Sequence, residues 1–210
     1  VRMINGQSVL GVILARGGSK RLPGKNLRPF RGKPLIAWTI LAGKCSRYID
    51  RLIISTDDPG ITLLGAEHAC EVLERPAELA SDEAASEDAL RHAAKACGVY
   101  DWLVLLQPTS PLRTAGDIDL CIERAQLGHG CISTWHGKRN GAVYVATSAW
   151  LAVHDFSHLG LLKYEMPEWQ SVDIDTEEDF KRAEEIAAAH EKFIENDLHE
   201  GDKALFARMK

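Results

Sequence analysis

The sequence predicts a three-layer α/β/α fold around a mostly parallel sheet. Two short runs, VLGVILA at 9–15 and WLVLL at 102–106, are almost wholly apolar and rich in branched residues. Runs of this kind are typical of strands that helices cover on both faces. Longer segments with helical spacing lie between them. Strands that alternate with helices in this way favour a parallel sheet between two helical layers.

Each predicted element has a local signal. Three helices have recognisable starts at Asp58, Thr114 and Thr176: the first is followed by proline, and the other two precede an aspartate by three residues, as in a capping box. Gly98 and Gly128 lie where glycine commonly ends a helix. The predicted strands are 9–15, 51–56, 102–106, 131–134 and 142–147, and the predicted helices are 34–45, 58–70, 86–98, 114–128 and one that starts at 176.

The composition is that of a globular protein, and the length of the chain favours one domain. The chain has 210 residues, of which 45% are hydrophobic and 26% are charged, and its formal net charge is −5. We predict one domain over residues 1–190 and a charged helical tail over 191–210. The negative charge argues against a nucleic-acid partner that is held by a broad basic face.

Cysteine usage and hydropathy bear on the location of the protein. The five cysteines show none of the close spacings that zinc sites and redox motifs use. We therefore expect buried thiols in a reducing compartment, the cytoplasm. No apolar run approaches the length of a membrane span, and the first residues lack the apolar stretch of a signal peptide, so we expect no membrane partner.

A basic, glycine-rich loop follows the first predicted strand. The segment ARGGSKRLPGKN, residues 15–26, holds three glycines and four Arg or Lys residues. Glycines let backbone N–H groups approach an anion closely, and cationic side chains neutralise its charge. Phosphate is therefore the first candidate ligand. A surface loop that only turns the chain is the alternative when this segment is considered alone.

Two common phosphate-binding motifs do not fit this loop. A P-loop has four residues between its first glycine and the Gly-Lys pair, whereas five residues separate Gly18 from Gly24. In addition, Lys25 is followed by Asn26, not by the Ser or Thr that would hold magnesium. The dinucleotide fingerprint G-x-G-x-x-G does not fit either, because Gly17 and Gly18 are adjacent and Gly24 follows only after five residues.

Two further segments follow predicted strands. LLQPTSPLR, residues 105–113, places Gln, Thr and Ser between two prolines, which suits recognition of a base edge by a rigid loop. In SVDID, residues 171–175, Asp173 and Asp175 are two apart, so on an extended segment both carboxylates point to one side. Such a pair suits Mg²⁺, although an exposed turn explains it equally well when it is considered alone. Because ligand loops gather at the carboxyl ends of strands, the three segments together predict one nucleoside triphosphate site.

The sequence resembles the cytidylyltransferases that make CMP-activated acidic sugars. The resemblance rests on ARGGSKRLPGKN, LIAWTI, ISTDD, RPAELASD, LLQPTSPLRTAGDID, NGAVYV and SVDIDTEEDF, which occur in this order between residues 9 and 185. It is strongest for the acylneuraminate (CMP-sialic acid synthetase) group with its pseudaminic and legionaminic relatives. It implies a Rossmann-like nucleotidyltransferase fold of the nucleotide-diphospho-sugar transferase type. It also implies that CTP is joined to a 2-keto sugar acid and that pyrophosphate is released.

The resemblance also implies a set of nucleotide contacts. Arg16, Ser19 and Lys25 would contact the triphosphate, with Asn26 beside them. The full implied nucleotide-binding set is Ala15, Arg16, Gly17, Gly18, Ser19, Lys25, Asn26, Arg75, Ser81, Gln107, Pro108, Thr109 and Ser110, of which Arg75, Ser81 and Gln107 would contact the cytidine or ribose.

The implied catalytic residues are Lys25, Arg16, Asp173 and Asp175, and the two aspartates would hold the Mg²⁺ cofactor. The anomeric 2-hydroxyl of the sugar would attack the α-phosphorus in line. The protein would then contribute mainly by positioning the substrates and by stabilising charge.

One segment departs from the family pattern. In the acylneuraminate enzymes a long insertion before the NGAVYV strand reaches the partner subunit and helps to bind the sugar acid. Here only WHGKR, residues 135–139, lies between Thr134 and Asn140. A homodimer and the identity of the acceptor are therefore open. Transfer to another acceptor, such as a sugar phosphate, and a non-catalytic nucleotide-binding paralogue are the alternative functions.

Overall fold

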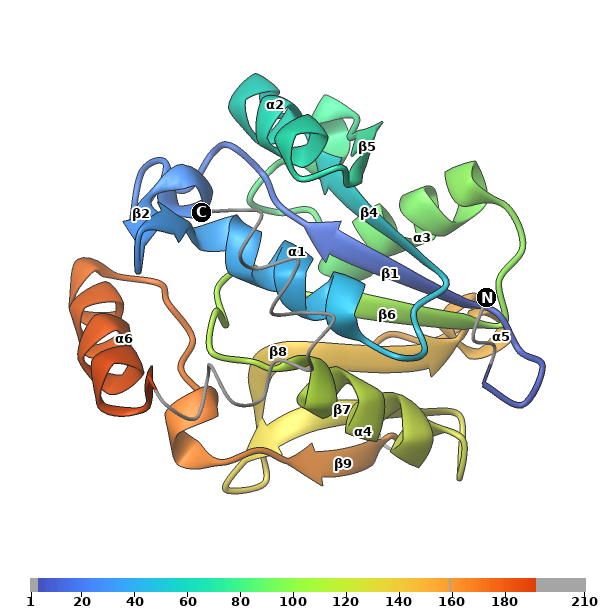
Figure 1. The fold of residues 1–210 in the computed structure, drawn as a ribbon. Helices are drawn as coiled ribbons and strands as arrows, with labels where there is room; N and C mark the ends of the chain where they lie inside the picture. The colour runs from blue at the N-terminus through green and yellow to red at the C-terminus, as the bar shows by residue number, and fades with distance from the viewer. Residues whose placement is uncertain (1–3, 159, 192–210) are drawn as a thin grey trace.

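A seven-stranded sheet forms the centre of the protein (Figure 1). The computed structural model describes residues 4–158 and 160–191. The strand order is β5-β4-β1-β6-β8-β7-β9, and β8 alone among these described strands runs against the others. The strands are β1 (Val9–Leu14), β4 (Arg51–Thr56), β5 (Glu71–Glu74), β6 (Trp102–Leu106), β7 (Gly130–Trp135), β8 (Lys138–Thr147) and β9 (Leu162–Glu165). The predicted mostly parallel sheet is confirmed.

Helices cover both faces of the sheet. On one face, Ile13 of β1 and Ile122 of α4 belong to the same apolar cluster. On the other face, Val12 packs in a cluster with Leu90 and Trp150. The helices of the first face are α1 (Leu35–Cys45), α2 (Pro59–Glu67) and α4 (Ala115–Ala125), and those of the second are α3 (Ser86–Cys97) and α5 (Ser148–Leu151). Because both faces are buried, β1 (VLGVIL) and β6 (WLVLL) at the centre of the sheet carry no polar side chain other than the Trp102 ring nitrogen.

The last described helix packs against the hairpin that follows the loop after β1. In α6 (Glu177–Ala189), Phe180 packs edge-on against Phe30, with ring centroids 5.7 Å apart. Phe30 belongs to a small antiparallel hairpin of β2 (Pro29–Phe30) and β3 (Lys33–Pro34). Thr176 and Asp179 form the predicted capping box at the start of α6. This packing brings the segment just before α6 next to the loop that follows β1.

The structure differs from the sequence prediction at several boundaries. The helix that begins at Asp58 ends at Glu67 rather than near Cys70, because Ala69 has a φ of 47° and the Cys70 N–H donates to the Gly65 carbonyl. The helix predicted to end at Gly128 ends three residues earlier, at Ala125. The strands β5 and β9 were not predicted, because each is a short edge strand that pairs on one side.

We propose that residues 1–190 form one domain, since β1 and β4 to β9 share one sheet, α1 to α5 cover its two faces, and α6 packs against the β2–β3 hairpin. The predicted tail over 191–210 lies outside the described residues, apart from Glu191. In the described part of the chain, the helices are too short or too polar to cross a membrane.

Candidate functional site

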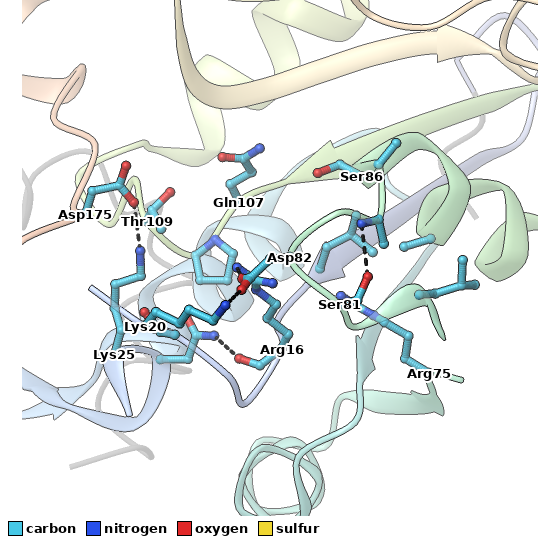
Figure 2. A pocket seen from close by; sticks show the side chains of 18 of the residues that line it. Arg16, Lys20, Lys25, Arg75, Ser81, Asp82, Ser86, Gln107, Thr109 and Asp175 are labelled. Carbon is cyan, nitrogen blue, oxygen red and sulfur yellow. Dashed lines mark hydrogen bonds and ion pairs between the residues drawn. The ribbon is translucent and has the colours of Figure 1, made fainter. Parts of the chain in front are cut away.

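The candidate site lies at the carboxyl edge of the sheet, where the loops after β1, β5 and β6 meet. A pocket of about 570 Å³ opens there, a size typical of small-molecule sites. The following predicted site residues line it: Arg16, Ser19, Lys25, Asn26, Arg75, Ser81, Gln107, Pro108, Thr109 and Asp175. Four parts of the sequence, within 14–26, 75–89 and 107–109 and at Asp175, therefore share one pocket (Figure 2).

Other predicted residues lie beside or behind the pocket rather than in its lining. These are Ala15, Gly17, Gly18, Ser110 and Asp173. Ala15 and Ser110 are fully buried, and the Ala15 N–H donates to the Ser55 carbonyl at 3.1 Å. Ala15 and Ser110 therefore contribute to the wall behind the cavity, because their side chains are not part of its lining.

Lys25 joins the first and the last of the predicted segments. Its Nζ donates to the Ile174 carbonyl at 2.7 Å and pairs with Asp175 Oδ1 at 3.1 Å. The other oxygen of Asp175 pairs with Arg21 at 2.8 Å. Lys25 is 9% exposed, whereas the Arg21 side chain is 69% exposed. Lys25 is thus a nearly buried cation held against the acidic segment.

Arg16, at the start of the loop after β1, is held by Asn26 and Asp82. The Asn26 side-chain amide donates to the Arg16 carbonyl at 3.0 Å, which closes the loop on itself. The Arg16 guanidinium pairs with Asp82 Oδ1 at 2.7 Å, and Lys20 pairs with the second oxygen of the same carboxylate. The sequence analysis did not single out Asp82 or Lys20, although both line the pocket.

Arg75 is a buried cation in the pocket wall. Its Nε donates to the Ser55 hydroxyl at 3.1 Å, and its guanidinium also contacts the Ser55 carbonyl. Burial lowers the pKa of Arg75 to about 10, while Asp57 acts in the opposite direction. Arg75 therefore stays charged at neutral pH. Asp57 also accepts a hydrogen bond from the Gly17 N–H at 3.0 Å.

A second buried arginine supports the loop after β6. Arg113 donates to the carbonyls of Gln107 at 3.1 Å and Ala142 at 3.0 Å. Burial lowers the pKa of Arg113 to about 10. Because it bridges the residue after β6 and the middle of β8, Arg113 fixes the backbone from which the Gln107 side chain enters the pocket.

Asp173 lies next to this loop, across Gly141. A Cβ added at Gly141 would lie 3.2 Å from Gln107 Oε1 and 3.4 Å from Asp173 Oδ2, so both side chains approach that backbone closely. Asp173 keeps a solvent-exposed surface, yet burial of its carboxyl raises its pKa, and the nearby Asp175 raises the pKa further. Two carboxylates thus lie near each other at the edge of the pocket.

The helix α3 contributes a wall that the sequence analysis missed. Ala85, Ser86 and Ala89 line the pocket from the start of this helix. The only sequence signal was the helix start at Ser86, followed by Glu87 and Asp88, which says nothing about where the helix packs. The position of this wall depends on the contact between α3 and the sheet.

The short segment 135–139, which the sequence analysis identified as a departure from the family pattern, forms the hairpin connection between β7 and β8. His136 and Gly137 form its turn with φ values of 49° and 71°, as in the two-residue turns that match the twist of a hairpin. The Glu165 carboxylate accepts hydrogen bonds from the Gly137 N–H at 3.2 Å and from the Thr134 hydroxyl at 2.7 Å. The segment 135–139 is therefore a tight turn attached to β9.

The two adjacent loop glycines provide a testable contrast. A Cβ at Gly17 would lie 2.5 Å from Asp58 Oδ2, whereas a Cβ at Gly18 would have no atom within 4 Å. Asp58 caps α2 by accepting from the Ile61 N–H at 3.0 Å. Gly17→Ala is expected to displace this cap and lower the free energy of unfolding by about 1 kcal/mol. Urea denaturation measures the change.

Gly18→Ala is the matched control for that substitution and is expected to leave the unfolding midpoint unchanged. Equal loss of stability in both variants would contradict the close contact between Gly17 and Asp58.

The comparison with known families agrees with this geometry. Residues 10–129, more than half of the chain, match the family described as Cytidylyltransferase. The chain belongs to the cytidylyltransferase family. The matched region includes the basic loop after β1 and the loop after β6, but not Asp173 or Asp175.

Curated relatives of this cytidylyltransferase chain are similar to it over about half of its length. The N-acylneuraminate cytidylyltransferase of Escherichia coli is 37% identical over 110 residues, which cover 52% of this chain and 26% of that protein. The CMP-N,N'-diacetyllegionaminic acid synthase of Legionella pneumophila is 39% identical over 120 residues, which cover 55% of this chain and 52% of that protein. The chain thus spans about half or less of the length of these relatives.

Solved structures support the fold. A CMP:2-keto-3-deoxy-manno-octonic acid synthetase complexed with CTP is similar with a TM-score of 0.72 and 15% identity, over 88% of this chain and all of that chain. A Mycobacterium tuberculosis protein in complex with manganese is similar with a TM-score of 0.64 and 18% identity, over 85% of this chain and 98% of that chain. At these identities the likeness shows the Rossmann-like α/β fold.

Proposed function

We propose that the protein transfers a cytidylyl group from CTP to a 2-keto sugar acid of the sialic acid type and releases pyrophosphate. One observation carries the proposal: the nearly buried Lys25 contacts Asp175, and both residues line a pocket that the loop after β6 also lines. Family membership and the names of the curated relatives support the nucleotide and the acceptor class.

The pocket offers separate surfaces to the parts of CTP. Arg16, Ser19 and Lys25 present cationic and hydroxyl groups on the β1 loop, which suits a triphosphate. Arg75 and Gln107 lie on other walls, and their donors and acceptors suit the ribose or the cytosine edge. The pocket volume of about 570 Å³ is sufficient for a nucleotide.

The two aspartates fit a divalent cation. Among the described residues, no group of three or more His, Cys, Asp or Glu side chains could hold a metal ion by itself. However, Asp175 lies close enough to Asp173 for its charge to raise the pKa of Asp173, and both residues offer only oxygen donors. Mg²⁺ commonly binds one or two carboxylates and completes its shell with water and substrate phosphate. We therefore propose that Asp173 and Asp175 hold Mg²⁺, which would supply Lewis acid polarisation of the phosphate when bound.

The chain's own groups mainly position and neutralise charge. Lys25 is directed by the Ile174 carbonyl toward the acidic segment, where its ammonium can offset charge that develops on the phosphates during transfer. Arg16 lies at the other part of the loop and would stabilise the departing pyrophosphate. The acceptor 2-hydroxyl forms the new bond to the α-phosphorus, the bond to the β-phosphate oxygen breaks, and the hydroxyl proton passes to solvent.

A homodimer and a cytoplasmic location stay predictions. The element that reaches the partner in the acylneuraminate enzymes is represented here by the tight turn at 136–137. All five cysteines are free thiols, and Cys70, Cys121 and Cys131 are buried.

A substrate panel tests the proposed function. The protein is incubated with CTP, Mg²⁺ and one acceptor from sialic, legionaminic, pseudaminic and other 2-keto acids, and pyrophosphate release is measured. Release with an acidic keto sugar is expected. Turnover only with sugar phosphates would support the alternative acceptor class, and CTP binding without turnover would support the non-catalytic alternative. The other nucleoside triphosphates test the base preference.

A further inference from the structure

The Asp82 carboxylate occupies the cationic end of the pocket. Asp82 Oδ1 lies 2.7 Å from Arg16 Nη2, and its Oδ2 contacts Lys20 Nζ. Figure 2 shows the carboxylate between these two side chains. Asp82 comes from the segment between η2 (Ala77–Leu79) and α3, whereas both cations come from the loop after β1. One carboxylate therefore bridges two walls of the pocket.

Arg16 is one of the groups proposed to bind phosphate, and Lys20 is a second cation of the same loop that lines the pocket. Carboxylate and phosphate oxygens use the same guanidinium and ammonium donors. Asp82 and a bound phosphate therefore compete for Arg16 and Lys20. We propose that Asp82 is an exchangeable carboxylate, which a phosphate group of the ligand displaces on binding and which returns to Arg16 and Lys20 when pyrophosphate leaves. This inference rests on the proposed function for the identity of the phosphate ligand.

The local structure allows this exchange. The Asp82 side chain is 30% exposed and the Lys20 side chain is 82% exposed, so water can solvate either partner when the pair opens. Exposed ion pairs contribute little stability each. Residues 81–84 lie outside helices and strands and are held locally by a hydrogen bond from the Ala84 N–H to the Ser81 hydroxyl at 3.2 Å. A triphosphate, which carries several charges, can thus replace a single carboxylate.

The charge state of Asp82 favours competition at neutral pH. Hydrogen bonds from Lys20 and Arg16 hold the pKa of Asp82 below its usual range. The carboxylate is therefore ionised when nucleotide binds. As a consequence, every phosphate ligand binds more weakly than it would to the four loop cations without Asp82. Pyrophosphate is also released faster.

A pair of charge-matched variants tests the exchange. Asp82→Asn removes the competing carboxylate, and Glu83→Gln makes the same change in net charge at the next, exposed residue. Titration calorimetry without divalent metal measures the dissociation constant of pyrophosphate and then of CTP. Asp82→Asn is expected to bind pyrophosphate about three- to tenfold more tightly than Glu83→Gln. Asp82→Ser, with a smaller uncharged side chain, is expected to behave in the same way.

The outcomes separate this inference from the proposed function. Equal affinity in the Asp82 and Glu83 variants would overturn the exchange. Weaker binding in the Asp82 variants would also overturn it and would identify Asp82 as a residue that positions Arg16. Absence of pyrophosphate binding in all forms would overturn it as well. If the Asp82 variants bind pyrophosphate more tightly but no form binds CTP or releases pyrophosphate with any acceptor, the exchange stands and the proposed cytidylyl transfer fails.

Discussion

Lys25→Met is expected to lower kcat/KM for cytidylyl transfer by about 10²- to 10³-fold, the usual effect of removing one preorganised donor to developing charge. The reason is the position of Nζ, which is nearly buried and directed by the Ile174 carbonyl and Asp175. A buried ammonium keeps its orientation and is poorly screened by water, so its effect on phosphate charge is large. Pyrophosphate release at several CTP concentrations measures kcat and KM separately.

Arg21→Met is the matched control for Lys25→Met. Arg21 pairs with the second oxygen of the same Asp175 carboxylate, but its side chain is 69% exposed. Its removal is therefore expected to reduce kcat/KM by less than about tenfold. Similar losses in the two variants would show that the pairing with Asp175 matters rather than the burial of Lys25.

Asp173→Asn is expected to remove most Mg²⁺-dependent turnover, with a loss of about 100-fold or more. The physical reason is that Asp173 and Asp175 form the proposed cation site and that an amide is a weaker ligand than a carboxylate. A titration of activity against Mg²⁺ measures the effect. The variant is expected to show a nearly flat response over concentrations that saturate the wild type.

The same substitution is not expected to destabilise the fold. The pKa of Asp173 is raised by burial and by the neighbouring Asp175. Its protonated form is therefore favoured in the folded state, and stability from this group is lost as pH rises through the folded pKa. An amide carries no charge at neutral pH, so Asp173→Asn avoids the cost of burying an ionised carboxylate. The urea midpoint is therefore expected to stay equal or to rise.

Glu168→Gln serves as the control for Asp173→Asn. Glu168 is an exposed carboxylate in η3 (Glu168–Gln170), just before the acidic segment. It is expected to retain wild-type activity and Mg²⁺ dependence. A clear loss of stability in Asp173→Asn, or retained Mg²⁺ dependence, would contradict a cation site built on Asp173.

Much of the fold was predictable because its signals are local. β1 and β6 are continuous apolar runs, and two capping boxes start at Thr114 and Thr176 as predicted. In contrast, β5 and β9 were missed because a four-residue edge strand carries little apolar pattern of its own. Their pairing is specified by the neighbouring strand, which a local pattern does not contain.

The candidate site shows the same division. The basic loop, the loop after β6 and the aspartate pair were recognised because glycine, proline and charge occur there at unusual spacing. Asp82 was not recognised, because an aspartate in an exposed segment carries no chemical signal until its partners are known. Its pairing with Arg16 spans 66 positions of the chain and forms only once α3 packs against β1.

By itself, the sequence predicted a set of candidate site residues and the edge of the sheet where they would lie, because the loops that follow parallel strands such as β1 and β6 lie at the same edge. Only the tertiary structure decided that Lys25 meets Asp175, that Arg75 and Arg113 are buried cations, and that Asp82 lies among the loop cations. These contacts depend on packing between distant segments, such as α6 against the β2–β3 hairpin. Burial and distance set the strength of each charge interaction, and neither quantity is written in the local sequence.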